Sequence, residues 1–341
     1  MLIRMDGTVG TPATSLNYGL VNEWEQLPED FHHEDVVGVG VDSADRVFIL
    51  TRREARVVVY DRDGSFLTAW GEGFFTPRAH GLSVAPDDTL YCVDEGRQVI
   101  YHMTADGTVL QTIGTPDVAS DTGYDGKSVA SITRGGPPFN RPTNLAIAPD
   151  GNLFVSDGYG NARVHRFNRA GELVQSWGQP GNEPGQFNLV HGIAVTADGR
   201  VMVADRENDR IQIFSPDGEY LGQWTNVQRP TNITFDRDGR VYVSELWRRP
   251  DEPSFRFGLP SEDQPGRVSV FDPSGTVLAR WGGPDRCAPG NFVAPHDICV
   301  DSHGDIYVAE VTYSHGVSHG DVPEGCHSFQ KFARAPAPGH Q

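Results

Sequence analysis

Residues 144–157 read Asn144-Leu-Ala-Ile-Ala-Pro-Asp-Gly-Asn-Leu-Phe-Val-Ser-Asp157, and they are followed by Ala162-Arg-Val-His-Arg-Phe167 and Gly171-Glu-Leu-Val-Gln-Ser-Trp177. Apolar and polar residues alternate in each segment, which predicts β-strands with one buried face. Gly151 and Gly171 sit in two-residue turns and supply the positive φ angles that tight hairpins require. The stretch therefore predicts four short antiparallel strands joined by tight turns.

This pattern occurs six times along the chain. The unit that starts at His191 runs through Asp205 and Phe214 to Trp224, and the others start near Gly38, His80, Asn232 and His296. Four-stranded units of about 45 residues are typical of propeller blades. We expect an all-β fold, a six-bladed β-propeller formed as one domain by residues 16–333.

The last unit lacks a fourth strand before the chain becomes rich in Ala and Pro. The segment Tyr18-Gly-Leu-Val-Asn-Glu-Trp24 resembles the fourth strand of the third unit. Residues 20–24 are therefore expected to complete the last blade. Residues 1–15 and 334–341 are expected to be disordered.

Composition restricts the partners. The 341 residues carry a formal net charge of -18, and this acidic surface disfavours nucleic acid and anionic membranes as partners. No apolar leader and no run of ~18 apolar residues is present, so the expected location is cytoplasmic. Cys92 and Cys299 fall in strand patterns and are expected to be buried thiols, whereas Cys287 and Cys326 fall in loops and are either paired or free.

Three histidines recur in phase with the repeat. The first strand of each blade lines the axis, and its equivalent first residues are interpreted as Gly38, His80, Asn144, His191, Asn232 and His296. Histidines on alternate blades of six are 120° apart and converge at one depth. Three neutral imidazoles with an open fourth position are the usual ligands of catalytic Zn²⁺. The sequence predicts a metal site at His80, His191 and His296, with Fe²⁺, Co²⁺ or Ni²⁺ as alternatives to zinc.

Other polar residues reach the same rim, where the second strand of each blade ends. Arg52, Tyr159 and Arg206 follow such ends. Two arginines facing one site suggest a substrate carboxylate, although each arginine has a rim acid as an alternative partner. A tyrosine beside a metal can act as a general base, because a nearby cation favours the phenolate.

Long insertions gather at this end of the blades, at residues 115–143, 247–266 and 311–326. Long loops on one face of a rigid scaffold usually carry function. The third insertion contains His315, His319 and Cys326, which form either a second metal site or a solvated loop.

Several short motifs at these positions resemble the peptidyl-α-hydroxyglycine α-amidating lyase family of NHL-type propellers. The resemblance covers roughly residues 36–310 and rests on Gly38-Val-Gly-Val-Asp42 with Arg52, Ala79-His-Gly-Leu82, Asp157-Gly-Tyr-Gly-Asn-Ala-Arg163, Ala204-Asp-Arg-Glu-Asn-Asp-Arg210 and Ala294-Pro-His-Asp-Ile298. That family cleaves an N-acyl-α-hydroxyglycine to a primary amide and glyoxylate, using axial zinc.

The resemblance implies roles residue by residue. It makes His80, His191 and His296 zinc ligands, Tyr159 the catalytic tyrosine, and Arg52 and Arg206 the active-site arginines. It also implies a structural Ca²⁺ in the channel, bound by Asp297 and by the carbonyls of Val39 and Leu82. A separate monooxygenase would supply the hydroxylated substrate.

The chain departs from the family at two positions. Gly160 stands where the family has a disulfide-bonded Cys, which fits a reducing compartment, and Ala294 stands where a Met is common. Two other functions remain open from the sequence. One is a metal-dependent ester or lactone hydrolase, which needs no carboxylate clamp. The other is an NHL interaction scaffold without activity.

Overall fold

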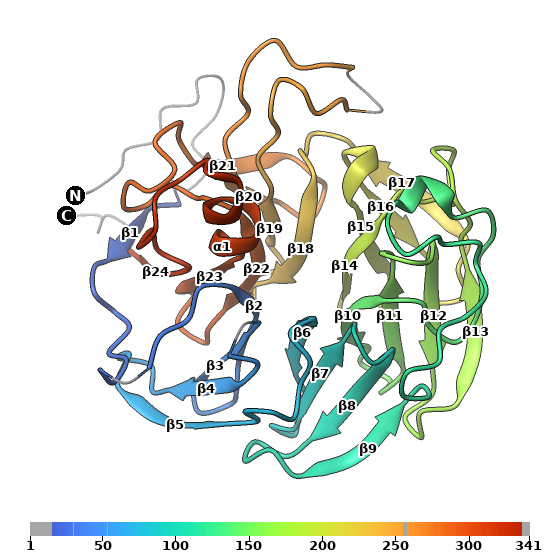
Figure 1. Cartoon of the computed structure of the whole chain (residues 1–341), viewed down its shortest axis with the longest axis horizontal. Helices are drawn as coiled ribbons and strands as arrows, with labels where there is room; N and C mark the ends of the chain where they lie inside the picture. The colour runs from blue at the N-terminus through green and yellow to red at the C-terminus, as the bar shows by residue number, and fades with distance from the viewer. Residues whose placement is uncertain (1–15, 30, 53, 255–257, 336–341) are drawn as a thin grey trace.

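Six four-stranded antiparallel sheets surround a central axis in the computed structural model (Figure 1). The structure describes residues 16–29, 31–52, 54–254 and 258–335. Each sheet is one blade, and its first strand lies next to the axis, so the predicted six-bladed all-β propeller is confirmed.

The first three blades follow the chain in order. Blade one consists of β2 (Val36–Val41), β3 (Val47–Thr51), β4 (Val57–Tyr60) and β5 (Phe66–Trp70). Blade two consists of β6 (Ala79–Val84), β7 (Leu90–Asp94), β8 (Val99–Met103) and β9 (Val109–Ile113). Blade three consists of β10 (Pro142–Ile147), β11 (Leu153–Asp157), β12 (Arg163–Phe167) and β13 (Leu173–Trp177), with a short 3-10 helix η1 (Val129–Ser131) before it.

The remaining blades close the ring. Blade four consists of β14 (Val190–Val195), β15 (Val201–Asp205), β16 (Arg210–Phe214) and β17 (Tyr220–Trp224), with η2 (Arg206–Asn208) inside it. Blade five consists of β18 (Pro230–Phe235), β19 (Val241–Glu245), β20 (Arg267–Phe271) and β21 (Val277–Trp281). Blade six consists of β22 (Pro295–Val300), β23 (Ile306–Glu310) and β24 (Phe329–Arg334), completed by β1 (Tyr18–Val21). Helices α1 (Thr312–His315) and η3 (Val317–His319) lie between β23 and β24.

The N-terminal strand closes the ring, as predicted, but it begins two residues earlier and ends three residues earlier than expected. β1 pairs antiparallel with β24, with Leu20 opposite Phe332. Glu23 has a positive φ of 51°, so the chain turns there. Trp24, expected inside the strand, instead leaves the sheet and packs against Tyr60 and Tyr307. The predicted disorder of residues 1–15 and 336–341 falls outside the described residues, and Arg334 belongs to β24.

The hydrophobic core is divided among the interfaces between neighbouring blades. Between blades three and four, Trp177 packs against Phe154 and Phe214, and Phe214 also contacts Phe187. Full burial of such a side chain contributes about 1.5–3 kcal/mol. Because every blade contributes to two interfaces, each inner strand is packed between the inner strands of its two neighbours.

The cysteines divide into two kinds. Cys287 and Cys326 form a disulfide that ties the segment after β21 to the insertion carrying α1. Cys92 and Cys299 are free thiols, the first buried and the second partly buried. No helix in the described part of the chain is long and apolar enough to cross a membrane.

Candidate metal centre and active site

The three predicted histidines meet on the axis. Their candidate ligand atoms lie within 4.8 Å of one another, and all three residues are buried. The ring centroids are 4.6 Å apart for His80 and His296, and 4.8 Å apart for each of the other pairs. Within the described residues this is the one group of three His, Cys, Asp or Glu side chains close enough to share an ion.

Each inner strand starts with a β-bulge. Because of this bulge, the residues equivalent to the histidines in the other blades differ by one position from those assumed in the sequence analysis. Ala79 pairs with Asp94 and Gly81 with Val93, which leaves His80 between two paired positions. Pro142 and Asn144 pair in the same way, which leaves Thr143 at the matching place. The counterparts of the histidines are therefore Val37, Thr143 and Thr231, and not Gly38, Asn144 and Asn232.

This alignment gives each imidazole an acceptor from the next blade. His80 Nδ1 lies 2.8 Å from the Thr143 carbonyl, His191 Nδ1 lies 2.8 Å from that of Thr231, and His296 Nδ1 lies 2.8 Å from that of Val37. A carbonyl only accepts, so each Nδ1 carries the proton and each Nε2 presents its lone pair. Such outer hydrogen bonds fix the ring orientation of histidines that bind metals.

The electrostatics keep these imidazoles neutral. Burial lowers the pKa of all three histidines well below the usual value. The neighbouring His296 imidazole and the positive charges of Arg52 and Arg206 lower the pKa of His80 further. His296 Nε2 is buried without a hydrogen-bond partner among the described residues. Neutral imidazoles whose Nε2 lone pairs face one another on the axis fit the donor set of a bound transition metal.

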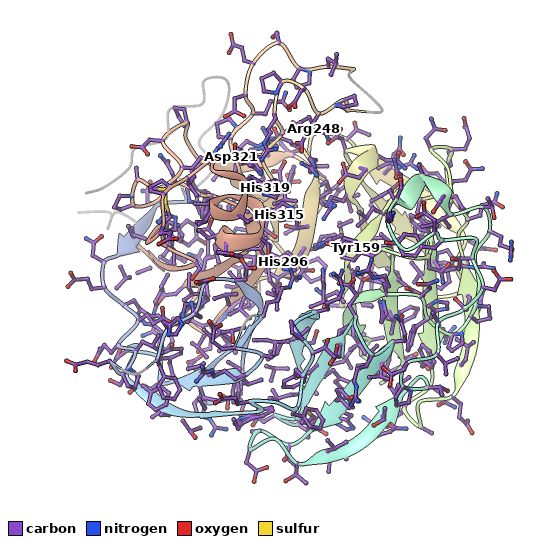
Figure 2. The ribbon with its side chains drawn as sticks, viewed as in Figure 1. Tyr159, Arg248, His296, His315, His319 and Asp321 are labelled. Atoms are coloured by element: carbon purple, nitrogen blue, oxygen red, sulfur yellow. A yellow bond between two sulfur atoms is a disulfide. The ribbon has the colours of Figure 1, made fainter. Side chains whose placement is uncertain are left out.

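Tyr159 lies directly against this cluster. Its hydroxyl oxygen is 3.2 Å from His191 Nε2 and 3.4 Å from His80 Nε2, and it accepts a hydrogen bond of 3.3 Å from Arg206. Figure 2 shows Tyr159 and His296 near the central channel, on different sides of it. The structure therefore brings the predicted tyrosine and one predicted arginine to the histidines.

Arg206 is held by a carboxylate that the sequence analysis missed. Arg206 is buried, and its Nε donates to Glu207 Oε1 at 2.8 Å. Arg229 donates to the same oxygen at 3.0 Å. Burial alone would raise the pKa of Glu207, but the charges of Arg229 and Arg206 hold it at about 2. The position of Glu207, directly after Arg206, was the available signal.

The acidic residues at the ends of the second strands, Asp157 and Asp205, bind backbone groups of their own blades and not Arg52 or Arg206. Asp157 accepts the backbone N–H of Asn140, and Asp205 accepts that of Asn188. These bonds fasten the segment entering a blade to the end of that blade's second strand. Arg52 Nε, in contrast, is buried without a partner among the described residues. A free donor beside the axial cluster is what an anionic ligand requires.

His315 belongs to this site and not to a second one. Cys326 is bonded to Cys287, which removes it from the expected group of His315, His319 and Cys326. His315 lies at the end of α1, on the side of His296 (Figure 2). Burial lowers its pKa to about 3, with the charges of Arg206, Arg229 and Arg52 as further causes. Its Nδ1 is buried without a partner in the described part of the structure.

Below the histidines, the same channel continues as a cavity of about 250 Å³. Val39, Leu82 and Asp297 all line it, as the calcium prediction requires. Asp297 accepts hydrogen bonds from the backbone of Val39 and Ile298 and from Asn232, and burial raises its pKa to about 7. Asn232 Oδ1 is buried without a partner among the described residues. This layer offers oxygen atoms, whereas the layer above offers nitrogen.

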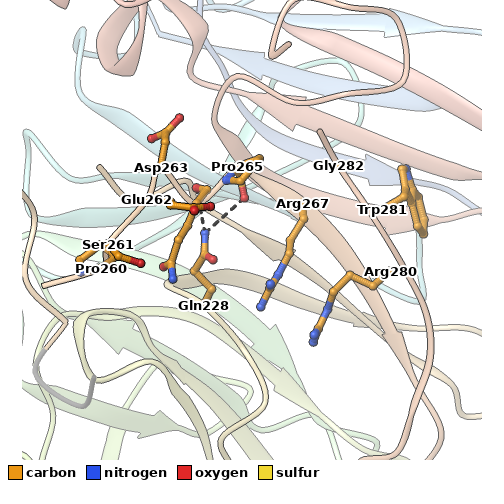
Figure 3. A pocket seen from close by; sticks show the side chains of 11 residues that line it. Gln228, Pro260, Ser261, Glu262, Asp263, Pro265, Arg267, Arg280, Trp281 and Gly282 are labelled. Carbon is orange, nitrogen blue, oxygen red and sulfur yellow. Dashed lines mark hydrogen bonds between the residues drawn. The ribbon is translucent and has the colours of Figure 1, made fainter. Parts of the chain in front are cut away.

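A larger cavity of about 450 Å³ lies away from the axis, on blade five (Figure 3). Arg267 and Arg280 point into it, but Arg267 is paired with Glu245, and Arg280 donates to Ser269 and Asn226. Both arginines are therefore already paired, and none of the predicted site residues lines this cavity, so it is not the candidate active site.

Fold and site together define a class: a six-bladed propeller with a buried three-histidine centre on its axis. An NHL repeat model matches residues 139–167, 187–214 and 292–319. NHL repeat-containing protein 3 from Mus musculus is 30% identical over 291 residues, which cover 80% of this chain and 76% of that protein. The chain belongs to this family of NHL-repeat proteins.

The amidating enzymes are also relatives. Peptidyl-glycine alpha-amidating monooxygenase B from Xenopus laevis is 28% identical over 340 residues, which cover 90% of this chain. Peptidyl-alpha-hydroxyglycine alpha-amidating lyase 1 from Drosophila melanogaster is 28% identical over 265 residues, which cover 71% of this chain. The chain spans 34% of the first enzyme and 44% of the second.

Solved structures support the fold. A streptogramin B lyase superimposes with a TM-score of 0.60 at 14% identity, covering 95% of this chain and all of the other. A putative gluconolactonase superimposes with a TM-score of 0.57 at 16% identity, covering 89% of each chain. At this identity the similarity establishes the propeller fold alone.

Proposed function

We propose that this protein is a metal-dependent carbon–nitrogen lyase that cleaves an N-acyl-α-hydroxyglycine to a primary amide and glyoxylate. The observation that carries the proposal is the contact of the Tyr159 hydroxyl with two of three converging imidazoles and with Arg206. The amidating relatives, which share sequence over most of this chain, support it.

The three Nε2 atoms would hold a divalent transition metal, zinc in the first place. When bound, such a metal supplies Lewis-acid activation of a substrate oxygen. The fit rests on the protonated Nδ1 atoms, the neutral rings and the unpartnered Nε2 of His296.

Tyr159 is the proposed general base. Its oxygen takes the proton of the substrate hydroxyl, and Arg206, 3.3 Å away, stabilises the negative charge that the oxygen carries before this transfer. The C–O bond becomes a carbonyl, the C–N bond breaks with its electron pair on nitrogen, and that nitrogen takes up the proton that Tyr159 received, which regenerates the base. The reaction needs no oxidant or reductant.

Arg52 and Arg206 are proposed to hold the substrate carboxylate. Arg52 has a buried Nε without a partner among the described residues, and Arg206 is kept in place by Glu207. The unpartnered Nδ1 of His315 lies in the same surroundings of positive charge. We therefore expect His315 to contact the bound substrate.

We further propose a structural Ca²⁺ at Asp297 and the carbonyls of Val39 and Leu82. Calcium prefers carboxylate and carbonyl oxygens, and the unpartnered Asn232 Oδ1 in the same layer adds one more. A separate monooxygenase would supply the hydroxylated substrate. The expected cytoplasmic location stays a prediction.

Glyoxylate release tests the proposal. Purified protein loaded with Zn²⁺ is incubated with N-benzoyl-α-hydroxyglycine, and glyoxylate and benzamide are measured. Equal amounts of both products are expected. Absence of both, at full metal occupancy and across several acyl groups, would overturn the lyase. Hydrolysis of neutral lactones by an Arg52→Ala, Arg206→Ala double variant would instead favour a hydrolase.

A further inference from the structure

A third cavity, of about 540 Å³, lies at the rim between blades three and four. One wall comes from the insertion 115–143 and the other from the segment that enters blade four. Its apolar lining includes Val129, Ile132, Ala162, Phe187 and Leu189. Cavities of this size and character usually take an apolar group of a ligand.

Two segments of the cavity lining continue along the chain from residues of the candidate active site. Asn161 and Ala162 line it and follow Tyr159 in the chain, while Glu207 and Asn208 line it and follow Arg206. Glu207 also binds Arg206, and Arg206 binds Tyr159. The lining is thus connected through two hydrogen bonds to the proposed base.

One residue of this lining, Asn208, carries a polar atom that has no partner among the described residues. Asn208 is 5% exposed, and its Nδ2 donates to the Gly181 carbonyl at 3.0 Å and to Asp205 Oδ2 at 2.8 Å. Both acceptors lack protons to donate, so these bonds fix the amide orientation. Asn208 Oδ1 is then an acceptor that no described residue satisfies. A buried acceptor without a donor is costly, and a ligand N–H would satisfy it.

We propose that this cavity binds the residue that precedes the α-hydroxyglycine of a peptidyl substrate, with an apolar side chain against Phe187 and Ile132 and its backbone N–H donated to Asn208 Oδ1. The inference rests on the proposed function, because the arginines place the substrate carboxylate at the axis and the acyl side must extend away from it. The substrate class is then a peptide with an apolar residue before its terminal glycine.

Binding of the product amide tests this subsite without any turnover. Affinities of N-acetyl-phenylalaninamide and N-acetyl-aspartamide for the zinc-loaded protein are measured by calorimetry. Burial of the phenyl ring is expected to make the first bind about tenfold tighter or more. The N-methylated analogue of the first amide, which lacks the N–H for Asn208, is expected to bind more weakly than its parent. Equal affinities for all three amides would overturn the proposal.

A variant at the mouth of the cavity adds a second test. Ala130 lines the cavity and is exposed, so Ala130→Trp fills it without disturbing the core. It should remove the preference for the phenylalanine amide, whereas Val118→Trp, on an exposed residue of the same insertion, should keep it. Retention of the preference in Ala130→Trp would overturn the assignment. Selective amide binding without glyoxylate release would support the cavity as a binding site and would refute the proposed lyase activity. The failure of one proposal is therefore distinguishable from the failure of the other.

Discussion

The axial histidine layer and the rim above it are built in different ways. His80, His191 and His296 occupy matching bulges of three inner strands, and the next blade supplies the acceptor in every case. Tyr159 and Arg206, in contrast, follow strand ends, and their positions depend on loops that differ from blade to blade. The comparison teaches that the repeat fixes the metal ligands, whereas non-repeating segments fix the reactive groups.

The largest effect is expected from removing an axial ligand. Loss of an outer hydrogen-bond partner alone costs about 10- to 100-fold in metal affinity, so loss of a ligand costs more. His191→Ala should reduce both bound metal and glyoxylate release to background. Elemental analysis and the glyoxylate assay check this. His102→Ala is the matched control, since His102 lies on β8 and bonds Thr89. Full metal content in His191→Ala would mean that the layer is not a metal site.

Removing the Tyr159 hydroxyl should lower the rate of the reaction without changing the amount of bound metal. Tyr159→Phe should lower kcat by about 10²–10⁴-fold, the usual contribution of a general base, with metal content unchanged. Tyr124→Phe is the control, because Tyr124 bonds Arg141 and not a site residue. Kinetics and elemental analysis on the same preparation check this. A kcat within a few-fold of the wild type would remove Tyr159 from the mechanism.

The same contrast explains what could be predicted from the sequence. The six repeats, the closing strand and the convergence of the histidines follow from periodicity, because equivalent positions of a ring share one depth. The exact counterparts of the histidines in the other three blades did not follow, because they lie one residue earlier than the sequence alignment placed them. The β-bulge that causes this shift leaves no mark in the alternation of apolar residues. Val37, Thr143 and Thr231 were therefore missed as the sources of the acceptor carbonyls.

The rim was less predictable. Arg52, Tyr159 and Arg206 were found because they follow strand ends. The role of Glu207 and the placement of His315 depend on how loops pack, which no repeat encodes. Cys287 and Cys326 illustrate the limit, since their pairing depends on two insertions that meet only in the folded ring.

The Cys287–Cys326 disulfide links two loops of the rim covalently. It joins residues 39 apart, and the double variant Cys287→Ser, Cys326→Ser should lose about 3–4 kcal/mol of unfolding free energy, measured by denaturant titration. The axial layer should keep its metal, because no inner strand contains either cysteine. Metal loss in the variant would show that layer and rim are not independent.

The same cysteines test the expected compartment. Disulfides are rare in cytosolic proteins, where thiols are kept reduced. Mass spectrometry of protein alkylated directly in its native cells measures the fraction of Cys287 and Cys326 that is bonded. Predominantly free thiols would agree with the expected cytoplasmic location, and a predominantly bonded pair would contradict it.

Glu207 provides the smallest and most specific test of the rim. Glu207→Gln leaves Arg206 and Arg229 without their shared carboxylate, which should cost about 3 kcal/mol at neutral pH and lower kcat/KM through the displaced Arg206. Glu219→Gln, at an exposed turn, is the control. Metal content should not change, because the axial histidines do not contact Glu207 through any described hydrogen bond.

The pH dependence identifies the cause of that loss. The pKa of Glu207 is about 2 in the folded protein, below its ordinary value of 4.5, so the unfolded chain binds this proton more readily. The stabilisation by the carboxylate is therefore complete above pH 4.5 and is lost as the pH falls towards 2. The difference in unfolding free energy between wild type and Glu207→Gln should be constant from pH 7 to 5 and should shrink below pH 4.5. A difference independent of pH would mean that Glu207 acts through packing, and Arg206 would then owe its position to the loop itself.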